Sequence, residues 1–226
     1  MSFTDFGEIA KSKNQVVVIT HVATSKTISF PAFLTNYSDS YSVQWGEETV
    51  YGRNDPIKPY NSTSRQLSIA FDVLAPSFEK AQENLTKFQT FVKMLYPMYS
   101  APLDGSGESL GRTIKAPPLL RVRFVNMIQN TAGDSSLLGC IEGIDFEPDD
   151  ASGYFIGNNG DMFPKSFNIS FRFTPQHESP LGWDSTTREF LTNTFPYAAE
   201  RNQALPEDQG GQNARLNNAS NDRALS

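Results

Sequence analysis

The longest regular alternation of apolar and polar residues in this chain covers residues 66–74. The apolar positions are Leu67, Ile69, Phe71 and Val73, and small or polar residues separate them. Successive side chains of a strand point to opposite faces of a sheet, so a period of two over this length indicates a strand. We therefore predict a strand here with one face on the core.

A helix is predicted directly after this strand. Apolar residues recur at spacings of three and four, which place them on one stripe of a helix. They are Phe78, Ala81, Leu85, Phe88, Val92 and Leu95. Ser77 is suited to cap the helix at its N-terminus, and Pro97 is expected to end it. Because so few turns lie between strands, packing of the stripe on a sheet is favoured over a coiled coil.

Six further segments have the β-branched content or the alternation of strands. They are residues 15–21, 27–34, 41–45, 119–128, 137–146 and 165–174. The short connection over residues 130–136 predicts a hairpin, and residues 186–195 predict a turn or two of helix. We expect a mainly β fold: an antiparallel sandwich or barrel flanked by one long helix, with extended loops and arms.

The division of the chain follows from where bulky apolar residues occur. Residues 1–14 are mixed and polar, and we expect them to form an N-terminal arm. Residues 15–199 are expected to form a single domain, since no repeat or second domain is visible. Beyond residue 200 almost no bulky apolar side chain remains, so residues 200–226 cannot bury enough surface to offset ordering and are predicted to be a flexible tail.

Charge and cysteine content exclude several classes of protein. The 226 residues carry a formal net charge of −6, which argues against a general nucleic-acid binder because phosphates require a basic face. The single cysteine, Cys140, excludes an internal disulfide framework and thiolate zinc sites. No run of 18 apolar residues exists, and the N-terminus lacks a secretory h-region. We expect an intracellular product or a part released by lysis, with no membrane partner.

No pattern in the sequence carries catalytic or metal-binding chemistry. His21 and His177 lie near strand ends, without the spacing that sets two ligands on one face. Pro148 interrupts the acidic residues between 142 and 150, so a solvated strand end is favoured over a calcium loop. No nucleophile elbow or phosphate loop occurs. We expect that the protein is not an enzyme and binds no cofactor. A catalytic pair of carboxylates from distant strands remains an open alternative, because sequence spacing does not reveal such pairs.

Two arginines share one face of the predicted strand 119–128. Arg121 and Arg123 alternate with apolar residues, and pairing with Glu142 or Asp145 across the hairpin is expected. Binding of a polyanion is the less favoured alternative because it conflicts with the net charge.

Residues 45–60 place large apolar side chains where two prolines exclude a central strand. We expect a long ordered loop or an edge hairpin. Aromatic residues on such a loop, beside an arginine and an aspartate, have the composition of an interaction hot spot. The candidate protein-interaction residues are Trp45, Val50, Tyr51, Arg53, Asp55, Ile57 and Tyr60. The alternative is that these side chains cover the helix or a sheet edge.

Several segments, in order, resemble the baseplate tail-tube initiator proteins of contractile-tailed bacteriophages. They are Val50-Tyr51-Gly52-Arg53-Asn54-Asp55-Pro56-Ile57, residues 65–73, Leu95-Tyr96-Pro97, residues 116–124, residues 138–141, Tyr154-Phe155, Phe163-Pro164-Lys165 and Leu181-Gly182-Trp183-Asp184. The resemblance covers roughly residues 15–185. It rests on short segments distributed along the chain and not on a catalytic signature. It implies a tail-tube-like fold and a homohexameric ring between the central hub and the first tube ring.

The resemblance implies a virion structural protein of the phage baseplate, assembled in the host cytoplasm, which initiates tube polymerisation. Its partners would be its own copies and the hub and tail-tube proteins, with DNA only passing through the lumen. An acidic lumen would repel that DNA. The alternatives are another tube-like ring protein, such as a tube cap or hub adaptor, a carbohydrate-binding β-sandwich using Trp45, Trp183 or Tyr51 as sugar platforms, or a hydrolase with scattered carboxylates.

Overall fold

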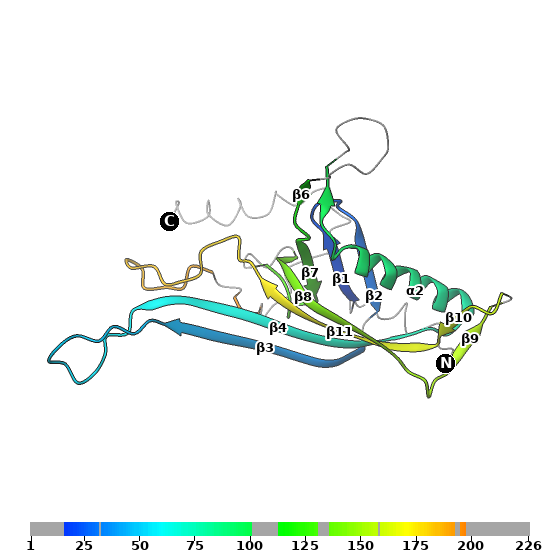
Figure 1. Ribbon diagram of the computed structural model, residues 1–226, viewed down its shortest axis with the longest axis horizontal. Helices are drawn as coiled ribbons and strands as arrows, with labels where there is room; N and C mark the ends of the chain where they lie inside the picture. Colours follow the sequence, from blue (N-terminus) through cyan, green and yellow to red (C-terminus); the bar gives the residue numbers. More distant parts are fainter. Residues whose placement is uncertain are drawn as a thin grey trace, which may run out of the picture.

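A seven-stranded antiparallel sheet dominates the protein. The computed structural model describes residues 16–31, 33–100, 113–130, 136–157, 159–192 and 195–197. Within them the strand order is β2-β1-β7-β8-β11-β4-β3 (Figure 1). The bounds are β1 Val16–His21, β2 Thr27–Pro31, β3 Phe33–Trp45, β4 Tyr60–Leu74, β7 Leu120–Phe124, β8 Leu137–Pro148 and β11 Ser166–Pro175. The predicted arm, residues 1–14, and tail, residues 200–226, lie outside the described residues.

Two small sheets and a helix complete the described architecture. Strand β5 (Met98–Tyr99) pairs with β6 (Ile114–Ala116), and β9 (Tyr154–Ile156) pairs with β10 (Met162–Pro164). Helix α2 spans Phe78–Lys93, and the Ser77 side chain accepts a hydrogen bond from the backbone N–H of Lys80. The predicted helix and its cap are therefore confirmed.

The sheet curls so that its two ends face each other across one core. Strands β1, β2 and β7 run across the direction of β3, β4 and β11 (Figure 1). The rings of Phe30 on β2 and Phe71 on β4 lie 5.9 Å apart, although four strands separate β2 from β4 in the sheet. This curling confirms a mainly antiparallel β fold of sandwich or barrel type, built here from one continuous sheet.

Helix α2 covers the inner, apolar face of the long strands. Phe91 is fully buried, and its ring lies 5.7 Å from that of Phe171 on β11. Phe88 stacks on Phe146 of β8 at 4.4 Å. Burial of aromatic rings removes large apolar areas from water, so this contact is a main source of stability. The expected packing of the stripe on a sheet is confirmed.

Three element predictions were wrong. Residues 27–34 and 41–45 were predicted as separate strands, but β2 ends at Pro31 and β3 runs unbroken through Phe33–Trp45. Residues 35–40 are nearly all polar, and they hold strand geometry because β3 pairs with β4 along its whole length. Tertiary pairing thus overrides weak local propensity.

The other two errors concern the end of β7 and the predicted helix over residues 186–195. Strand β7 stops at Phe124, because Val125 has a positive φ of 49° and Ile128 folds back to exchange hydrogen bonds with Phe124. In the described part of residues 186–195, a turn follows Asp184 and an isolated bridge joins Trp183 to Phe190, so this stretch is not helical.

Candidate functional site

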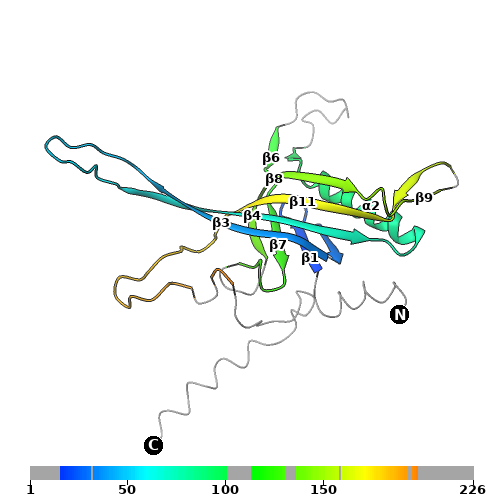
Figure 2. The same cartoon turned by 90° about the horizontal axis from the view of Figure 1, so that it is seen from below.

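Strands β3 and β4 continue beyond the sheet as a projecting ribbon. Gly46 N–H donates to the carbonyl of Pro59 at 2.8 Å, and Glu48 and Ile57 exchange two hydrogen bonds of 2.9 Å. A turn closed by Arg53 N–H and the Val50 carbonyl forms its end. The ribbon extends away from the other strands in both views (Figures 1 and 2). Residues 46–59 are therefore an edge hairpin, one of the two forms expected from the prolines.

The predicted interaction residues are exposed on this hairpin. Their side chains do not cover the helix or the sheet edge: Tyr51 is fully exposed, and Trp45 and Tyr60 are each 57% exposed. The rings of Trp45 and Tyr60 meet edge to face at 5.6 Å. We call Trp45, Val50, Tyr51, Ile57 and Tyr60 the tip patch. Arg53 and Asp55 lie exposed in the turn region next to it.

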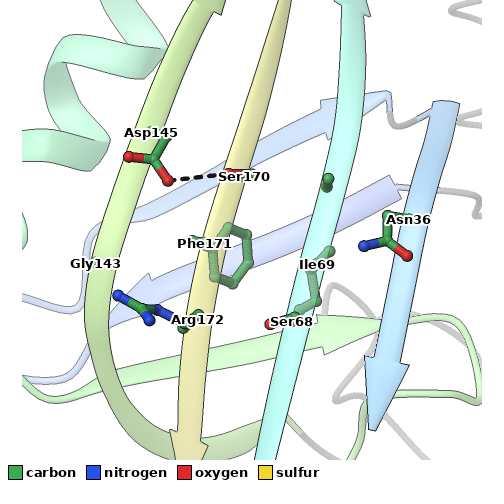
Figure 3. Close-up of a pocket in the computed structure, with 9 residues that line it drawn as sticks. Asn36, Ser68, Ile69, Gly143, Asp145, Ser170, Phe171 and Arg172 are labelled. Atoms are coloured by element: carbon green, nitrogen blue, oxygen red, sulfur yellow. Dashed lines mark hydrogen bonds between the residues drawn. The ribbon is translucent and has the colours of Figure 1, made fainter.

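The outer face of the long strands, opposite helix α2, is polar. On β4 and β11 the side chains that alternate with the buried aromatic and aliphatic residues include Gln66, Ser68, Asp72, Asn168, Ser170 and Arg172. An open depression of about 370 Å³ lies on this face between β3, β4, β8 and β11. Figure 3 shows its side chains, with Asp145 of β8 hydrogen-bonded to Ser170 of β11.

Acidic groups outnumber basic groups on this outer face. Strand β8 contributes Glu142, Asp145 and Glu147, and β4 contributes Asp72. Arg172 is the basic residue that β11 adds. Hydrogen bonds to neutral neighbours orient the acids. Asn168 Nδ2 donates to Asp72 at 2.7 Å, and Gln66 Nε2 donates to Glu142 at 3.0 Å. The sequence contained these acids, but only strand pairing places them on one surface.

The inner face of the paired strands β3 and β4 carries a buried ion pair. Arg65 of β4 donates to both carboxylate oxygens of Asp39 on β3, with the shortest contact at 2.7 Å. Three rings, those of Tyr41, Phe195 and Tyr197, lie 5.5–5.9 Å from the Arg65 guanidinium carbon. Aromatic faces attract cations, so these rings replace part of the lost hydration. No sequence pattern indicated this cluster, because its members lie up to 158 residues apart and follow no motif.

The cluster shifts the pKa values of its members. Burial opposes ionisation of Asp39, but hydrogen bonds from Arg65 and Tyr197 outweigh burial and lower its pKa. Burial and hydrogen bonding to Asp39 raise the pKa of Tyr41 above its ordinary value, against the opposing effect of Arg65. Burial, together with the positive charge of Arg65, lowers the pKa of His177. At neutral pH the cluster therefore holds a charged pair, neutral phenols and a neutral imidazole.

The chain after β11 forms the rest of this cluster. We call residues 176–192 and 195–197 the strap. Near its start Glu178 forms a two-armed ion pair with Arg121 on β7, at 2.6 and 2.8 Å. Near its end the Tyr197 hydroxyl donates to Asp39 at 2.6 Å. Arg121 was expected to pair with Glu142 or Asp145. That prediction was wrong, since Arg121 lies opposite Leu138 of β8 and binds Glu178 instead.

The described residues hold no cluster of metal-ligating side chains. No group of three or more His, Cys, Asp or Glu residues in this part of the chain lies close enough to hold a metal ion. Asp149, one of the acids weighed as a calcium ligand, instead accepts a hydrogen bond from the Ala151 N–H within a turn. His21 is buried and contacts Thr24 at 2.8 Å. Helix α2, in turn, is too short and too polar to cross a membrane.

Comparisons with known proteins give distant structural matches. No protein-family model matches the chain, and no curated protein matches its sequence. The Dit protein of SPP1, a hub adsorption apparatus protein of phages that infect Gram-positive bacteria, aligns with 71% of this chain at 10% identity and a TM-score of 0.38. This chain spans 50% of that protein's length. A chain from the tail of an empty GTA particle with C6 symmetry aligns with 74% of this chain, and 97% of its own length, at 12% identity and a TM-score of 0.31.

Proposed function

We propose that this protein is a non-enzymatic structural subunit of a phage-type tail. In this proposal six copies form a ring in the baseplate that joins the central hub to the tail tube and starts tube polymerisation. The observation that carries the proposal is the tip patch, in which large apolar side chains are exposed along the projecting part of an ordered hairpin. Several large apolar side chains exposed on one ordered element are typical of a protein contact.

The two edges of the curled sheet support a ring. In the described residues β3 and β2 are its outermost strands, and they differ in length, with 13 and 5 residues. A head-to-tail ring needs unlike surfaces on the two sides of each subunit. An edge strand also presents backbone groups that can pair with a neighbouring chain. Subunits side by side would thus extend the sheet from one copy to the next.

The polar outer face supports a channel lining. A lumen that passes DNA must be wetted and must not bind phosphate. Hydroxyls, amides and an excess of carboxylates on the outer face meet both needs, because like charges repel. The segments resembling tail-tube initiator proteins support the specific place at the start of the tube. They include the tip residues Val50 to Ile57 and the strand over residues 65–73.

The test is assembly of the full-length protein. Light scattering after size exclusion, and negative-stain images, would be recorded for the protein alone and with the hub protein of the same phage. We expect six-fold rings, or rings seated on the hub. A monomer at high concentration that stays monomeric with its hub partner would contradict the proposal.

A pair of variants separates the tip from general stickiness. Tyr51→Ser with Ile57→Ser removes apolar area from the tip patch, and we expect weaker assembly because both side chains are exposed in the protomer. Tyr96→Ser with Tyr99→Ser removes exposed apolar area at a different place. Unchanged assembly is expected for this control. Equal loss in both variants would argue against the tip as the contact.

Exposed tryptophans favour one second candidate, a carbohydrate-binding module. Trp183 is 73% exposed, and Trp45 is exposed as well. Sugar rings stack on such side chains. Pull-down with purified peptidoglycan, lost on Trp45→Ala or Trp183→Ala, would support this alternative. We favour the ring, because the rings of Trp45 and Trp183 each already meet another aromatic ring edge to face.

A further inference from the structure

The strap connects two parts of the sheet that are distant in strand order. Its first anchor is the ion pair between Glu178 and Arg121 on β7. Its second anchor is the contact of Phe195 and Tyr197 with Arg65 and Asp39 on the β3–β4 hairpin. In the sheet order, β8, β11 and β4 lie between β7 and β3. The strap therefore links β7 to the β3–β4 hairpin.

The second anchor is stronger than an ordinary surface contact. The Arg65 and Asp39 side chains are each only 4% exposed, although they lie where β3 and β4 begin to leave the body of the sheet. Charge-assisted hydrogen bonds in such a dry environment are stronger than neutral ones. The Phe195 ring also packs edge to face on Tyr41 at 6.2 Å and stacks on Phe190 at 5.8 Å.

A projecting two-stranded ribbon needs such support. Isolated hairpins are marginally stable in water, and twist and bend easily because they lack a packed layer on either face. In β3 the part beyond Asp39 pairs only with β4 among the described strands. The strap supplies aromatic packing at the base of that part, while Val43, Trp45 and Tyr60 farther along stay exposed.

We propose that the strap is a brace that fixes the direction of the hairpin, and that Arg65 is its docking residue. Phe195 and Tyr197 close over Arg65 and Asp39, so the hairpin cannot swing relative to the body. The brace presents the tip patch at a constant position. This inference concerns the protomer alone and holds whether or not six copies form a ring.

The test measures hairpin direction in the full-length chain. Cys140 is replaced by Ser, and spin labels are attached at Tyr51→Cys on the tip and Gln89→Cys on the exposed side of α2. Pulsed dipolar spectroscopy then gives the distribution of distances between the labels. We expect a narrow distribution with the wild-type strap. Phe195→Ala with Tyr197→Ala should broaden it about twofold or more.

The matched control is Leu191→Ala, an apolar truncation in the same strap at an exposed side chain. It should leave the distribution narrow. Amide exchange of the strap, expected to rise about tenfold or more in the double variant, shows that the strap was released. A released strap with an unchanged distance distribution would overturn the proposal. If the double variant folds poorly, Tyr197→Phe is used in its place, because it removes only the hydroxyl bound to Asp39. The proposal then requires a smaller broadening of the distance distribution in that variant.

Discussion

Arg65 and Asp39 form a two-armed ion pair whose side chains are almost fully buried, on the hairpin that extends farthest from the core. The Nε atom of Arg65 lies 3.0 Å from one carboxylate oxygen, and Nη2 lies 2.7 Å from the other. Two residues of the strap complete its surroundings. A charged pair thus replaces the apolar core where the sheet leaves the body of the protein.

Removing one member of this pair should destabilise the protein strongly. Arg65→Leu leaves Asp39 buried without its counter-charge, and we expect a loss of about 3–5 kcal/mol in the free energy of unfolding. Urea denaturation measures this value. Arg65→Lys keeps the charge but loses the two-armed geometry, so an intermediate loss is expected. Lys80→Ala, which removes the exposed ion pair with Glu83, is the control and should have little effect. A free energy of unfolding that is nearly unchanged in Arg65→Leu would contradict the role of the pair.

Acidification should weaken the strap through His177. Its ring contacts Phe195, its Nδ1 atom is buried without a hydrogen-bond partner among the described residues, and Arg65 adds a positive charge nearby while Asp39 partly offsets it. The phenols of Tyr37, Tyr41 and Tyr197 share the site and stay neutral in this range. The pKa of His177 in the folded protein therefore lies below its ordinary 6.5.

The sign of this pH effect follows from proton uptake. Below pH 6.5 His177 binds a proton more readily in the unfolded chain than in the folded protein. The contribution of neutral His177 to the free energy of unfolding is therefore fully present above that pH, and it declines as pH falls toward the pKa of His177 in the folded protein. Asp39, whose pKa is lowered, adds a further loss below about its ordinary 3.8. As pH falls from 7.5 to 5.5, strap amide exchange should rise relative to its intrinsic rate at each pH. His177→Gln should reduce that rise, and an identical rise in the variant would contradict this explanation.

Gly139 should resist substitution because the chain passes too close to it. A Cβ atom there would lie 2.3 Å from the carbonyl oxygen of Thr174 and 2.6 Å from the Phe173 ring. A backbone oxygen cannot move away cheaply, so Gly139→Ala should cost about 1–3 kcal/mol or more. Thermal denaturation would measure the loss. Gly182→Ala meets no atom within 4 Å and is the matched control.

Phe91 should be the most sensitive position of the helix. It is fully buried against Phe171, so Phe91→Ala should cost about 3–5 kcal/mol through lost burial and a residual cavity. Phe33→Ala is the control, since Phe33 is 41% exposed on the edge strand β3. Chemical denaturation of both variants would compare them. Similar losses would mean that the contact between helix and sheet is not the main core.

Charge reversal on the outer face should create affinity for DNA. Asp145→Lys with Glu147→Lys turns an acidic surface basic, and basic surfaces bind phosphates with an affinity that falls with salt. Gel shifts at low salt should detect binding by this variant and none by the wild type. Glu47→Lys with Glu48→Lys makes the same change of charge at the hairpin. If a ring forms with the outer face lining its lumen, DNA inside the lumen should bind to the ring of the Asp145→Lys, Glu147→Lys variant. It should not bind to the lumen of the Glu47→Lys, Glu48→Lys variant.

The sequence predicted the elements whose signal is local. The helix over Phe78–Lys93 and its Ser77 cap followed from spacing and capping chemistry, which act within a few residues. The strand over residues 66–74 followed from alternation. The interaction residues were chosen because prolines exclude a central strand, and they are exposed in the structure. Their role in a contact stays a prediction.

Other features depended on partners far along the chain. The polar residues 35–40 of β3 form a strand because β4 pairs with them. Arg121 binds Glu178 across 57 residues instead of the nearer acids that were expected. Ion pairs form wherever the backbone brings opposite charges together, and no spacing rule encodes that distance.

By itself the sequence determined a β-rich chain with one amphipathic helix, an apolar tip and an acidic balance. Those properties follow from residue type and short-range periodicity. Only the tertiary structure decided that the sheet curls as one piece, that the acids gather on its outer face, and that the strap closes on Arg65. These depend on which strands become neighbours, and the summed burial of the whole core, rather than any local segment, selects that pairing.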